Sequence, residues 1–359
     1  MPDILLFGAT GYTGRLTAHA LARRGASFAI AGRNRTRLQE LAQATGGPDV
    51  RVAAVGDVDA LVDALSDVKV MITCVGPFVE LGQTAVEAAL RAGVHYIDST
   101  GEGTFIEELI AARSQAATEA GIAMAPALGF DEVPADAAAT LATEGMSKAN
   151  LTLTYAFPSS GSRGTVRSAL GILGAEGVWL QDGRPRRIRA GQGSRWAPMP
   201  APLGPKPAVG FPLAEGHLAP LHLDLDSLEL YVTTDPVQRA LMRGGLPLLS
   251  RAAGTGIGKA IQKTVLDRLP EGPNDRQRSQ GRWTVLAEAA SEEGWRNVAL
   301  SGTDVYGLTA EFLSAGALRM CEGDFGLTGV VSPVQVMGID RWREEFIDHD
   351  VVIDIYEQR

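Results

Sequence analysis

The sequence predicts an α/β protein: a doubly wound parallel sheet, followed by a second α+β domain with a mainly antiparallel sheet. Short apolar runs alternate with amphipathic stretches over the first third of the chain, and a glycine-rich turn joins the first run to the first helical stretch. After about residue 150, strand-like alternation and long Pro/Gly-rich loops replace this pattern. We therefore expect one domain over residues 1–148 and another over residues 149–359.

Continuous apolar runs without polar alternation predict strands that are covered on both faces. These runs are Ile4–Phe7, Phe28–Ala31, Val52–Val55, Val70–Val75, Tyr96–Asp98 and Ile122–Ala125. The amphipathic stretches between them predict helices. These stretches are Thr13–Arg24, Thr36–Ala44, Val58–Leu65, Gly82–Ala92 and Thr104–Ala120.

The second domain is predicted from "NLTLTYAF", "SLELYVTT" and "WTVLAEAA", separated by loops such as "APMPAPLGPKPAVGFP". We expect its sheet to form a homodimer and a helix near residues 305–320 to pack back on the first domain. Residues 240–269 are rich in Leu, Ile and Ala and carry only basic charges before Asp267. They favour a helical hairpin over the active site, with contact to a membrane surface or an acyl carrier partner as the alternative.

The composition disfavours several function classes. A net charge of −9 argues against nucleic acid as the main partner. Two cysteines, Cys74 and Cys321, predict the reducing cytoplasm rather than a disulfide framework. The N-terminal segment lacks the basic region of a signal peptide, and no run of about 18 apolar residues predicts a transmembrane span. The cysteines and histidines show no metal-ligand spacing, so we expect no metal.

Three glycines lie between the first strand and the first helix in a G-x-x-G-x-x-G pattern. This context is typical of Rossmann-type dinucleotide binding, in which the helix N-terminus faces the pyrophosphate. A plain tight turn is the alternative. The predicted phosphate-binding residues are Gly8, Thr10, Gly11, Tyr12, Thr13 and Gly14.

The end of the second strand predicts the cofactor. An NAD site places an acidic residue about 20 positions after the glycines, but no acid occurs between Gly14 and Glu40. Arg33, Asn34 and Arg37 stand there instead, and a guanidinium suits a 2′-phosphate. We therefore predict NADP(H), with a solvated basic helix start as the alternative.

Two further strand ends belong to the same predicted crevice. Asp57 follows the third strand and is a candidate acceptor for the adenine amino group. The turn after the fourth strand is expected on the nicotinamide side. Its residues are Cys74, Val75, Gly76 and Pro77.

Several stretches resemble the saccharopine dehydrogenase-like oxidoreductases, in particular the branch of trans-acting enoyl reductases. The matching stretches are "GATGYTG", "AGRN", "CVGPF", "HYIDSTGE", "GFDEVPAD", "SRGTVRSAL", "GPNDRQRSQGRWTVLAEA" and "GTDVYGLTAEFL". The resemblance implies a Rossmann domain, a substrate domain and NADP(H)-dependent reduction. It places Asp98 and Glu102 in a "YxDxxGE" stretch and Asp131 in a "GFD" stretch. In "SRGT", Arg163 replaces a more usual glycine, which puts a lipid substrate in doubt.

Asp131 is the predicted proton donor, because it follows a strand end; a helix N-cap is the alternative reading. Glu102, Tyr155 and His222 are further candidates, each with an ordinary structural alternative. No Tyr-x-x-x-Lys pair follows the fourth strand, which disfavours short-chain dehydrogenase chemistry. The residues predicted to face the substrate are Glu102, Phe130, Tyr155, Arg163 and Thr165.

These observations favour an NADPH-dependent reductase of a C=C or C=N bond in a small molecule, free or carrier-bound. A saccharopine-type amino-acid dehydrogenase is one alternative, with Arg163, Arg167 and Arg195 as cations for substrate carboxylates. A protein that senses NADP(H) without catalysis is the other alternative.

Overall fold

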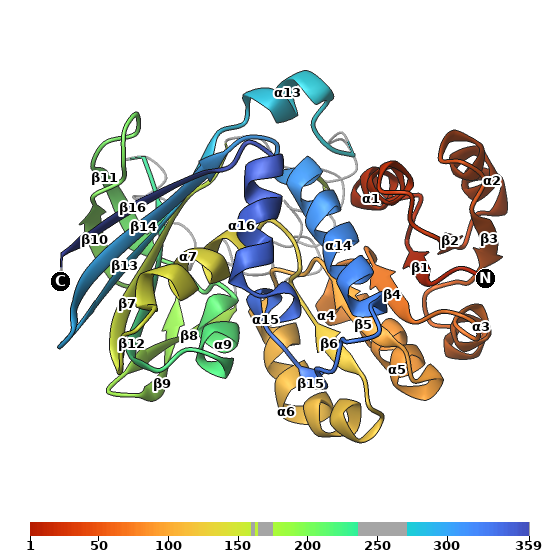
Figure 1. Cartoon of the computed structure of the whole chain (residues 1–359), viewed down its shortest axis with the longest axis horizontal. Helices are drawn as coiled ribbons and strands as arrows, with labels where there is room; N and C mark the ends of the chain where they lie inside the picture. Colours follow the sequence, from red (N-terminus) through yellow and green to blue (C-terminus); the bar gives the residue numbers. More distant parts are fainter. Residues whose placement is uncertain (159–161, 164–174, 236–270, 359) are drawn as a thin grey trace, which may run out of the picture. The chain divides into compact units, whose positions relative to one another are not determined.

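The computed structural model describes residues 1–158, 162–163, 175–235 and 271–358. The chain forms two compact units (Figure 1). The first unit comprises residues 1–101, 105–133 and 305–345, and the second comprises residues 102–104, 134–304 and 346–359. Thr165, Arg167 and the predicted hairpin at 240–269 lie outside the described residues.

The first unit contains a parallel sheet of seven strands in the order β15-β6-β5-β4-β1-β2-β3. Every pairing along this sheet is parallel, and the strand order reverses direction at β1 and β4. The predicted Rossmann-type sheet is therefore confirmed. Its strands are β1 (Ile4–Phe7), β2 (Phe28–Gly32), β3 (Asp49–Val52), β4 (Val70–Thr73), β5 (His95–Asp98), β6 (Ala123–Ala125) and β15 (Gly329–Val330).

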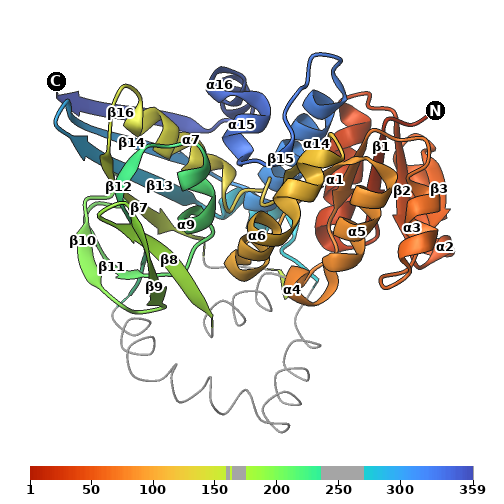
Figure 2. The same ribbon diagram turned by 90° about the horizontal axis from the view of Figure 1, so that it is seen from below.

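Helices cover both faces of this sheet, as the unbroken apolar strands require. α1 packs against α14, and α3 packs against α5, as Figures 1 and 2 show. The helices are α1 (Tyr12–Arg23), α2 (Arg35–Ala44), α3 (Val58–Ala64), α4 (Phe78–Leu81), α5 (Gln83–Ala92), α6 (Gly103–Glu119), α14 (Val305–Cys321), α15 (Pro333–Met337) and α16 (Ile339–Asp348).

The third strand lies three residues before the predicted one: it runs over Asp49–Val52, where we expected Val52–Val55. β3 is the edge strand of the sheet, and its residues are exposed or half-buried. An edge strand needs no continuous apolar run, so the apolar "VAAV" was a misleading signal.

Residues 305–345 return to the first unit, where α14 precedes β15 and β15 pairs with β6. The predicted division at residues 148 and 149 therefore differs from the observed units in three stretches. Residues 102–104 and 134–148 cluster with the second unit, and residues 305–345 cluster with the first. The β15 strand is only two residues long, too short to be recognised from sequence periodicity.

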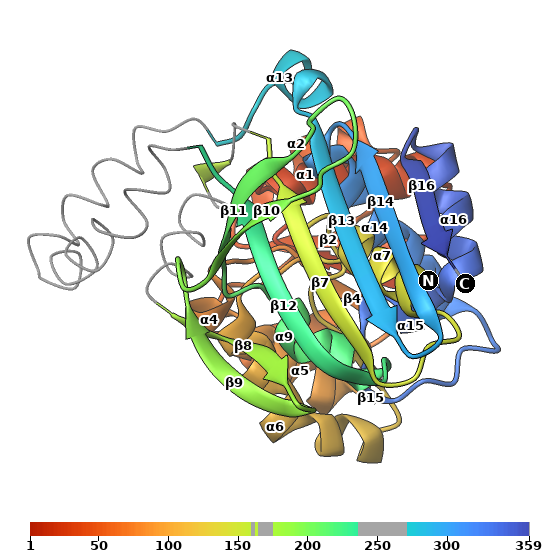
Figure 3. The ribbon, with the colours of Figure 1, turned by 90° about the vertical axis from the view of Figure 1, so that its left-hand side faces the viewer.

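The second unit contains a mixed sheet, whose central strands Figure 3 shows side by side. The main order is β10-β11-β12-β7-β13-β14-β16, and β8 pairs with β12 and β9. Pairing is antiparallel except between β7 and β12. The strands are β7 (Ala149–Ala156), β8 (Glu176–Gln181), β9 (Arg184–Arg189), β10 (Ser194–Ala197), β11 (Lys206–Gly210), β12 (Leu225–Thr233), β13 (Trp283–Ser291), β14 (Gly294–Gly302) and β16 (Val352–Gln358).

The mainly antiparallel second sheet is thereby confirmed, with one correction. β11 lies inside the stretch predicted as a long loop, where Lys206–Gly210 pairs with both β10 and β12. The Pro-rich composition concealed it. The helices of this unit include α7 (Val133–Thr143), α9 (Glu215–Leu218), the 3-10 helix η1 (Ala219–Leu221) and α13 (Asp275–Gln280).

Candidate functional site

The glycine turn forms a cradle between β1 and α1. Gly8 has a φ of +81°, and a Cβ at this position would lie 2.6 Å from Val75 Cγ2. A Cβ on Gly14 would lie 2.3 Å from the carbonyl oxygen of Gly8. Both positions therefore require glycine, one for its left-handed conformation and one for the close approach of helix to strand.

The N-terminus of α1 has no side-chain cap. Gly11 is its N-cap and supplies no side-chain hydrogen bond to the first-turn N–H groups. Arg15 donates from Nη1 to the carbonyl oxygen of Thr10 at 2.9 Å, which fixes the turn. Uncapped N–H groups and the helix dipole suit an anionic phosphate. The ring of Tyr12 packs edge-on against Tyr306 of α14, at a centroid distance of 5.2 Å.

The end of β2 carries the predicted 2′-phosphate residues. Arg33, Asn34 and Arg37 are all exposed there. The Asn34 side chain caps α2 by accepting a hydrogen bond from Arg37 N at 3.1 Å. Asn34 therefore holds the helix start in place, while the Arg33 side chain lies at the surface where a phosphate can reach it.

The other two strand ends have local structural roles as well. Asp57 caps α3 and accepts a hydrogen bond from Ala60 N at 3.0 Å. Cys74 N donates to the carbonyl oxygen of Phe7 at 3.0 Å, which places the Cys74–Pro77 turn beside the glycine cradle. Burial raises the pKa of the Cys74 thiol to about 12, so the thiol stays protonated and is not a nucleophile at neutral pH.

Asp131 lies in the loop after β6, at the carboxyl edge of the sheet. A Cβ on Gly101, in the loop after β5, would lie 3.5 Å from Asp131 Oδ2. The residue is exposed, yet surrounding protein atoms desolvate its carboxyl group and raise its pKa to about 6. A carboxyl group with this pKa holds and releases a proton near neutral pH. The neighbouring Phe130 is 3% exposed, and its N–H donates to Thr309 Oγ1 at 3.0 Å.

In the second unit, Tyr155 on β7 donates its hydroxyl hydrogen to Glu215 Oε1 on α9. Both residues are 1% exposed, and the Tyr155 ring stacks on Phe157 at 4.9 Å. Glu102, from the predicted "YxDxxGE" stretch, is also buried. Buried carboxyl groups persist only where polar partners compensate their desolvation.

A second buried pair joins His222 to Asp136, with Nε2 and Oδ1 2.7 Å apart. Burial by itself lowers the pKa of His222, but the Asp136 carboxylate outweighs it, and the pKa lies above its ordinary value. The Asp136 carboxylate therefore favours the protonated form of His222.

The predicted cations of the second unit are partly engaged. Arg195 forms an ion pair with Glu288 at 2.7 Å and lies over the ring of Tyr231. Arg163 is half-buried, and its backbone N–H donates to the carbonyl oxygen of Glu271.

The residues fit a dinucleotide phosphate cofactor: a Cβ would fill the cradle, the α1 N-terminus is uncapped, and an arginine is exposed at the end of β2. Comparison with known families agrees. Residues 4–125 match the model described as "Saccharopine dehydrogenase NADP binding domain". This chain carries a saccharopine dehydrogenase-type NADP-binding domain. The predicted cofactor, NADP(H), is thereby confirmed.

Curated relatives match part of this chain. A trans-acting enoyl reductase of Mycobacterium leprae is 37% identical over 141 residues, which is 37% of this chain and 34% of that protein. A saccharopine dehydrogenase-like oxidoreductase of Arabidopsis thaliana is 30% identical over 212 residues, 52% of this chain and 47% of that protein. The matches thus span about a third to a half of these relatives, and the predicted family resemblance is confirmed.

One solved structure has the same fold over the whole chain. Saccharopine dehydrogenase (L-Glu forming) from Saccharomyces cerevisiae, in its apo form, superposes with a TM-score of 0.67 at 13% identity. The superposition covers 100% of both chains. At this identity the likeness concerns the fold alone.

Three residues near the NADP-binding site were missed by the sequence predictions. Arg15 fixes the glycine turn, and Tyr306 and Thr309 of α14 contact Tyr12 and the Phe130 backbone. Tyr306 and Thr309 lie within the matching stretch "GTDVYGLTAEFL", whereas Arg15 directly follows "GATGYTG". The contacts of α14 span more than 170 residues, so no local pattern indicates them. Glu215 was missed because it lies in a stretch without periodicity.

The described residues contain no group of three or more His, Cys, Asp or Glu side chains arranged to hold a metal ion. Likewise, none of the helices that the structure describes combines the length and the hydropathy needed to cross a bilayer.

Proposed function

We propose that this protein is an NADPH-dependent reductase that adds a hydride and a proton across a C=C or C=N bond of a small molecule, free or carrier-bound. The observation that carries the proposal is the presence, along one sheet edge, of the glycine cradle and of Asp131, whose pKa is raised to about 6 by desolvation. A dinucleotide site and a proton-holding carboxyl group are the two parts that such a reduction needs.

Each part of the first unit has a role in this reaction. The N–H groups at the start of α1 bind the pyrophosphate, and Arg33 binds the 2′-phosphate. The Cys74–Pro77 turn lines the nicotinamide side. When bound, NADPH supplies a hydride from C4 of its nicotinamide. Asp131 holds the proton that the substrate takes up.

The residues that we predict to face the substrate are not confined to the first unit. They are Glu102, Phe130, Tyr155, Arg163 and Thr165.

The name of one of the two curated relatives supports reduction of a C=C bond. The Mycobacterium leprae relative is a trans-acting enoyl reductase, and the Arabidopsis relative is a saccharopine dehydrogenase-like oxidoreductase. A polarised enone or imine accepts a hydride with less help from an acid than a plain ketone does. This fits a site in which the pKa of Asp131 is raised to about 6 by desolvation.

The saccharopine-type alternative has less support. It needs several cationic side chains for substrate carboxylates, and Arg195 is already paired with Glu288. The third reading, a protein that senses NADP(H) without catalysis, predicts binding of NADPH but no turnover with any substrate.

The reaction is tested with NADPH deuterated at C4 and a panel of cyclic imines, enones and enoyl thioesters. We expect deuterium at the β-carbon or at the former imine carbon. Turnover of ketones or alcohols alone would refute the proposal, and binding without any turnover would favour the sensor. The variant Asp131→Asn separates hydride delivery from proton supply: NADPH binding persists while kcat falls.

The dependence of the reduction rate on pH tests whether Asp131 acts in its protonated form. Its pKa is raised to about 6, so the protonated form needed for reduction dominates below this pH. We expect kcat/KM for reduction to fall as the pH rises through about 6, and Asp131→Asn to lose this dependence. A rate that rises over the same interval would contradict the assignment.

We also propose a homodimer formed by the second sheet. Trp295, Val352 and Tyr356 are 40%, 54% and 50% exposed. They lie on one face of the β14–β16 pair, because Tyr356 is opposite Asn297 and Val352 is opposite Ser301, both at even spacing from Trp295. In light scattering, Trp295→Glu with Tyr356→Glu should give a monomer, whereas Ile347→Glu on α16 should not.

The proposed location is the cytoplasm, because Cys74 and Cys321 are both free thiols. A fluorescent fusion that concentrates on a membrane or a lipid droplet would contradict this location.

A further inference from the structure

Asp98 is the last residue of β5 and is 0% exposed. Its carboxylate accepts three hydrogen bonds. Oδ2 accepts from the Tyr96 hydroxyl at 2.6 Å, and Oδ1 accepts from Thr100 N at 2.8 Å and from Ala127 N at 2.9 Å. The three hydrogen bonds compensate the free energy that burial of the carboxylate costs. Removing any of the donors would therefore destabilise the folded protein.

Two of these donors belong to different loops. Thr100 lies in the loop that follows β5, and Ala127 lies in the loop that follows β6. The Asp98 carbonyl oxygen adds a further bond, accepted from Leu128 N at 2.8 Å. A single residue therefore fixes the start of both loops at the carboxyl edge of the sheet.

The β6 loop adopts a conformation that needs such support. Ala127 has a φ of +60°, in the left-handed region that residues other than glycine rarely occupy. A strained backbone of this kind persists only where neighbouring bonds determine it, at a cost of roughly 1–3 kcal/mol. The bond from Ala127 N to Asp98 supplies that constraint at the strained residue itself.

The far ends of the two loops meet at Asp131. Gly101 of the β5 loop is the residue whose Cβ would lie 3.5 Å from Asp131 Oδ2. On the β6 loop, Phe130 N donates to Thr309 Oγ1 at 3.0 Å, directly before Asp131. The β6 loop is thus held by Asp98 at one end and by α14 at the other, with Asp131 beside the β5 loop.

We propose that Asp98 is a positioning residue for Asp131: through its bonds to Thr100 and Ala127 it sets the two loops that place the Asp131 carboxyl group. This inference rests on the proposed function for its catalytic meaning, but not for its geometry. Asp98 is buried and touches neither substrate nor cofactor in this role. Its effect passes through the backbone of the two loops.

Tyr96 provides a matched control within the same network. It is buried beside Asp98, and burial raises the pKa of its phenol well above the ordinary value, so the hydroxyl donates. Tyr96→Phe removes one hydrogen bond to Asp98 and leaves both loop bonds in place. Asp98→Ala removes all three, and Asp98→Asn keeps an acceptor oxygen for the loop N–H groups.

The experiment measures the pKa of Asp131 by carbon-13 NMR of labelled aspartate, assigned with Asp131→Asn, together with NADPH affinity by calorimetry. In Asp98→Ala we expect the Asp131 pKa to fall from about 6 toward its ordinary value, because the loops relax into water. Asp98→Asn should restore most of the shift, and Tyr96→Phe should leave it unchanged. NADPH affinity should stay within about twofold in all three, because the α1 cradle is intact.

Once a substrate is found, Asp98→Ala should lower kcat by about 100-fold, the effect of displacing a reacting group by about 1 Å, with KM for NADPH unchanged. If Asp98→Ala does not fold, Asp98→Val is the second variant, because it also removes the acceptor of the bonds from Thr100 N and Ala127 N. An Asp131 pKa equal to that of the wild type in a folded Asp98→Ala or Asp98→Val variant would overturn the proposal. Failure to reduce any compound would refute the proposed function alone, because the NMR measurement needs no turnover.

Discussion

In the first unit, the groups suited to hold a ligand are the backbone N–H groups of α1 and an exposed arginine at the end of β2. In the second unit, the comparable polar side chains are buried in pairs, Tyr155 with Glu215 and Asp136 with His222. The exposed donors of the first unit cost little free energy when no ligand is bound, because water accepts their hydrogen bonds. The buried polar groups of the second unit need hydrogen-bond partners within the protein. The two units should therefore respond to substitution in different observables, ligand affinity in the first and stability in the second.

The largest expected effect is at Gly14. A Cβ there would lie 2.3 Å from the Gly8 carbonyl oxygen, so Gly14→Ala must displace the helix start from the strand. We expect NADPH affinity to fall by more than about 1,000-fold, ~4 kcal/mol. Gly323→Ala is the control, since nothing lies within 4 Å of its added Cβ. Calorimetric titration measures both, and near-normal binding by Gly14→Ala would contradict the cradle.

His222→Gln tests the second unit. Its side chain is 10% exposed and that of Asp136 is 3% exposed, so the substitution leaves a buried carboxylate without its cation. We expect unfolding free energy to fall by about 3 kcal/mol. The pKa of His222 is raised in the folded state, so this stability is fully present below the unfolded pKa and is lost as the pH rises through the folded value.

Chemical denaturation between pH 5 and pH 9 checks this prediction, with the exposed His19→Gln as control. The wild type should lose stability with rising pH over the interval in which His222→Gln does not. If the stability of the two proteins depended equally on pH, the ion pair between His222 and Asp136 would not contribute to the pH dependence of stability.

Arg33→Ala should weaken NADPH binding at least about tenfold, because a charge-assisted bond to phosphate contributes roughly 1.5–3 kcal/mol. NADH binding, which involves no 2′-phosphate, should change little. Equal losses of affinity for NADPH and NADH would show that Arg33 does not bind the 2′-phosphate. Protein stability should not change, since Arg33 is exposed.

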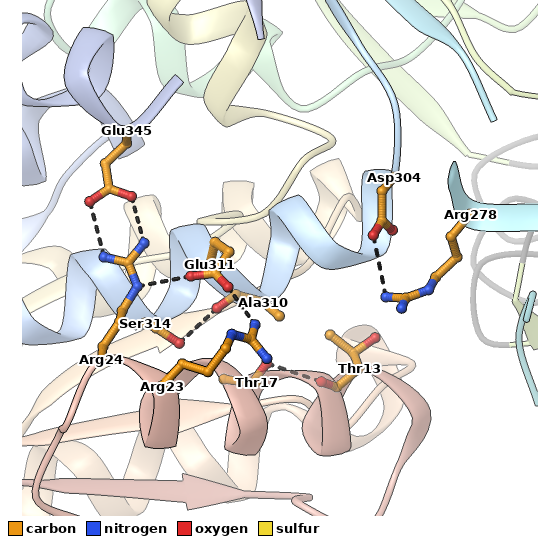
Figure 4. A network of polar contacts seen from close by, with 10 residues as sticks. All are labelled: Thr13, Thr17, Arg23, Arg24, Arg278, Asp304, Ala310, Glu311, Ser314 and Glu345. Atoms are coloured by element: carbon orange, nitrogen blue, oxygen red, sulfur yellow. Dashed lines mark hydrogen bonds and ion pairs between the residues drawn. The ribbon is translucent and has the colours of Figure 1, made fainter. Parts of the chain in front are cut away.

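The smallest effect is expected in a structural network of the first unit. Glu311 on α14 accepts from Arg23 Nη2 at 2.5 Å and from Arg24 Nε at 2.9 Å, and Arg24 also pairs with Glu345 (Figure 4). Glu311→Gln should lower stability by about 1.5 kcal/mol in thermal unfolding, because the group is partly buried. Glu322→Gln, in an exposed pair with Arg341, should change it by less than about 0.5 kcal/mol.

Local sequence patterns were enough for most of the first unit. Gly8 and Gly14 act through backbone conformation and contacts within a few residues, so their spacing alone identified the cradle. The apolar runs identified the buried strands for the same reason. The edge strand β3 was misplaced because it is not buried on both faces.

Long-range pairing accounts for what the sequence did not predict. Asp136 and His222 are 86 residues apart, and Phe130 and Thr309 are 179 apart, so neither spacing carries a signal. His222 was a candidate proton donor by residue type, but it is buried against Asp136, which favours its protonated form. Asn34 and Asp57 were predicted from position, and their helix-capping bonds became visible only in the folded backbone.

The return of residues 305–345 to the first unit has a consequence for biosynthesis. β15, the seventh strand of the parallel sheet, and α14, which packs on α1, leave the ribosome after the strands of the second unit from β7 to β14. Until then Glu311 cannot pair with Arg23 and Arg24, and Thr309 cannot accept from Phe130 N. The nucleotide-binding unit therefore begins first during translation and is finished late, and a nascent chain that stalls before residue 305 exposes the α1 surface that α14 later covers.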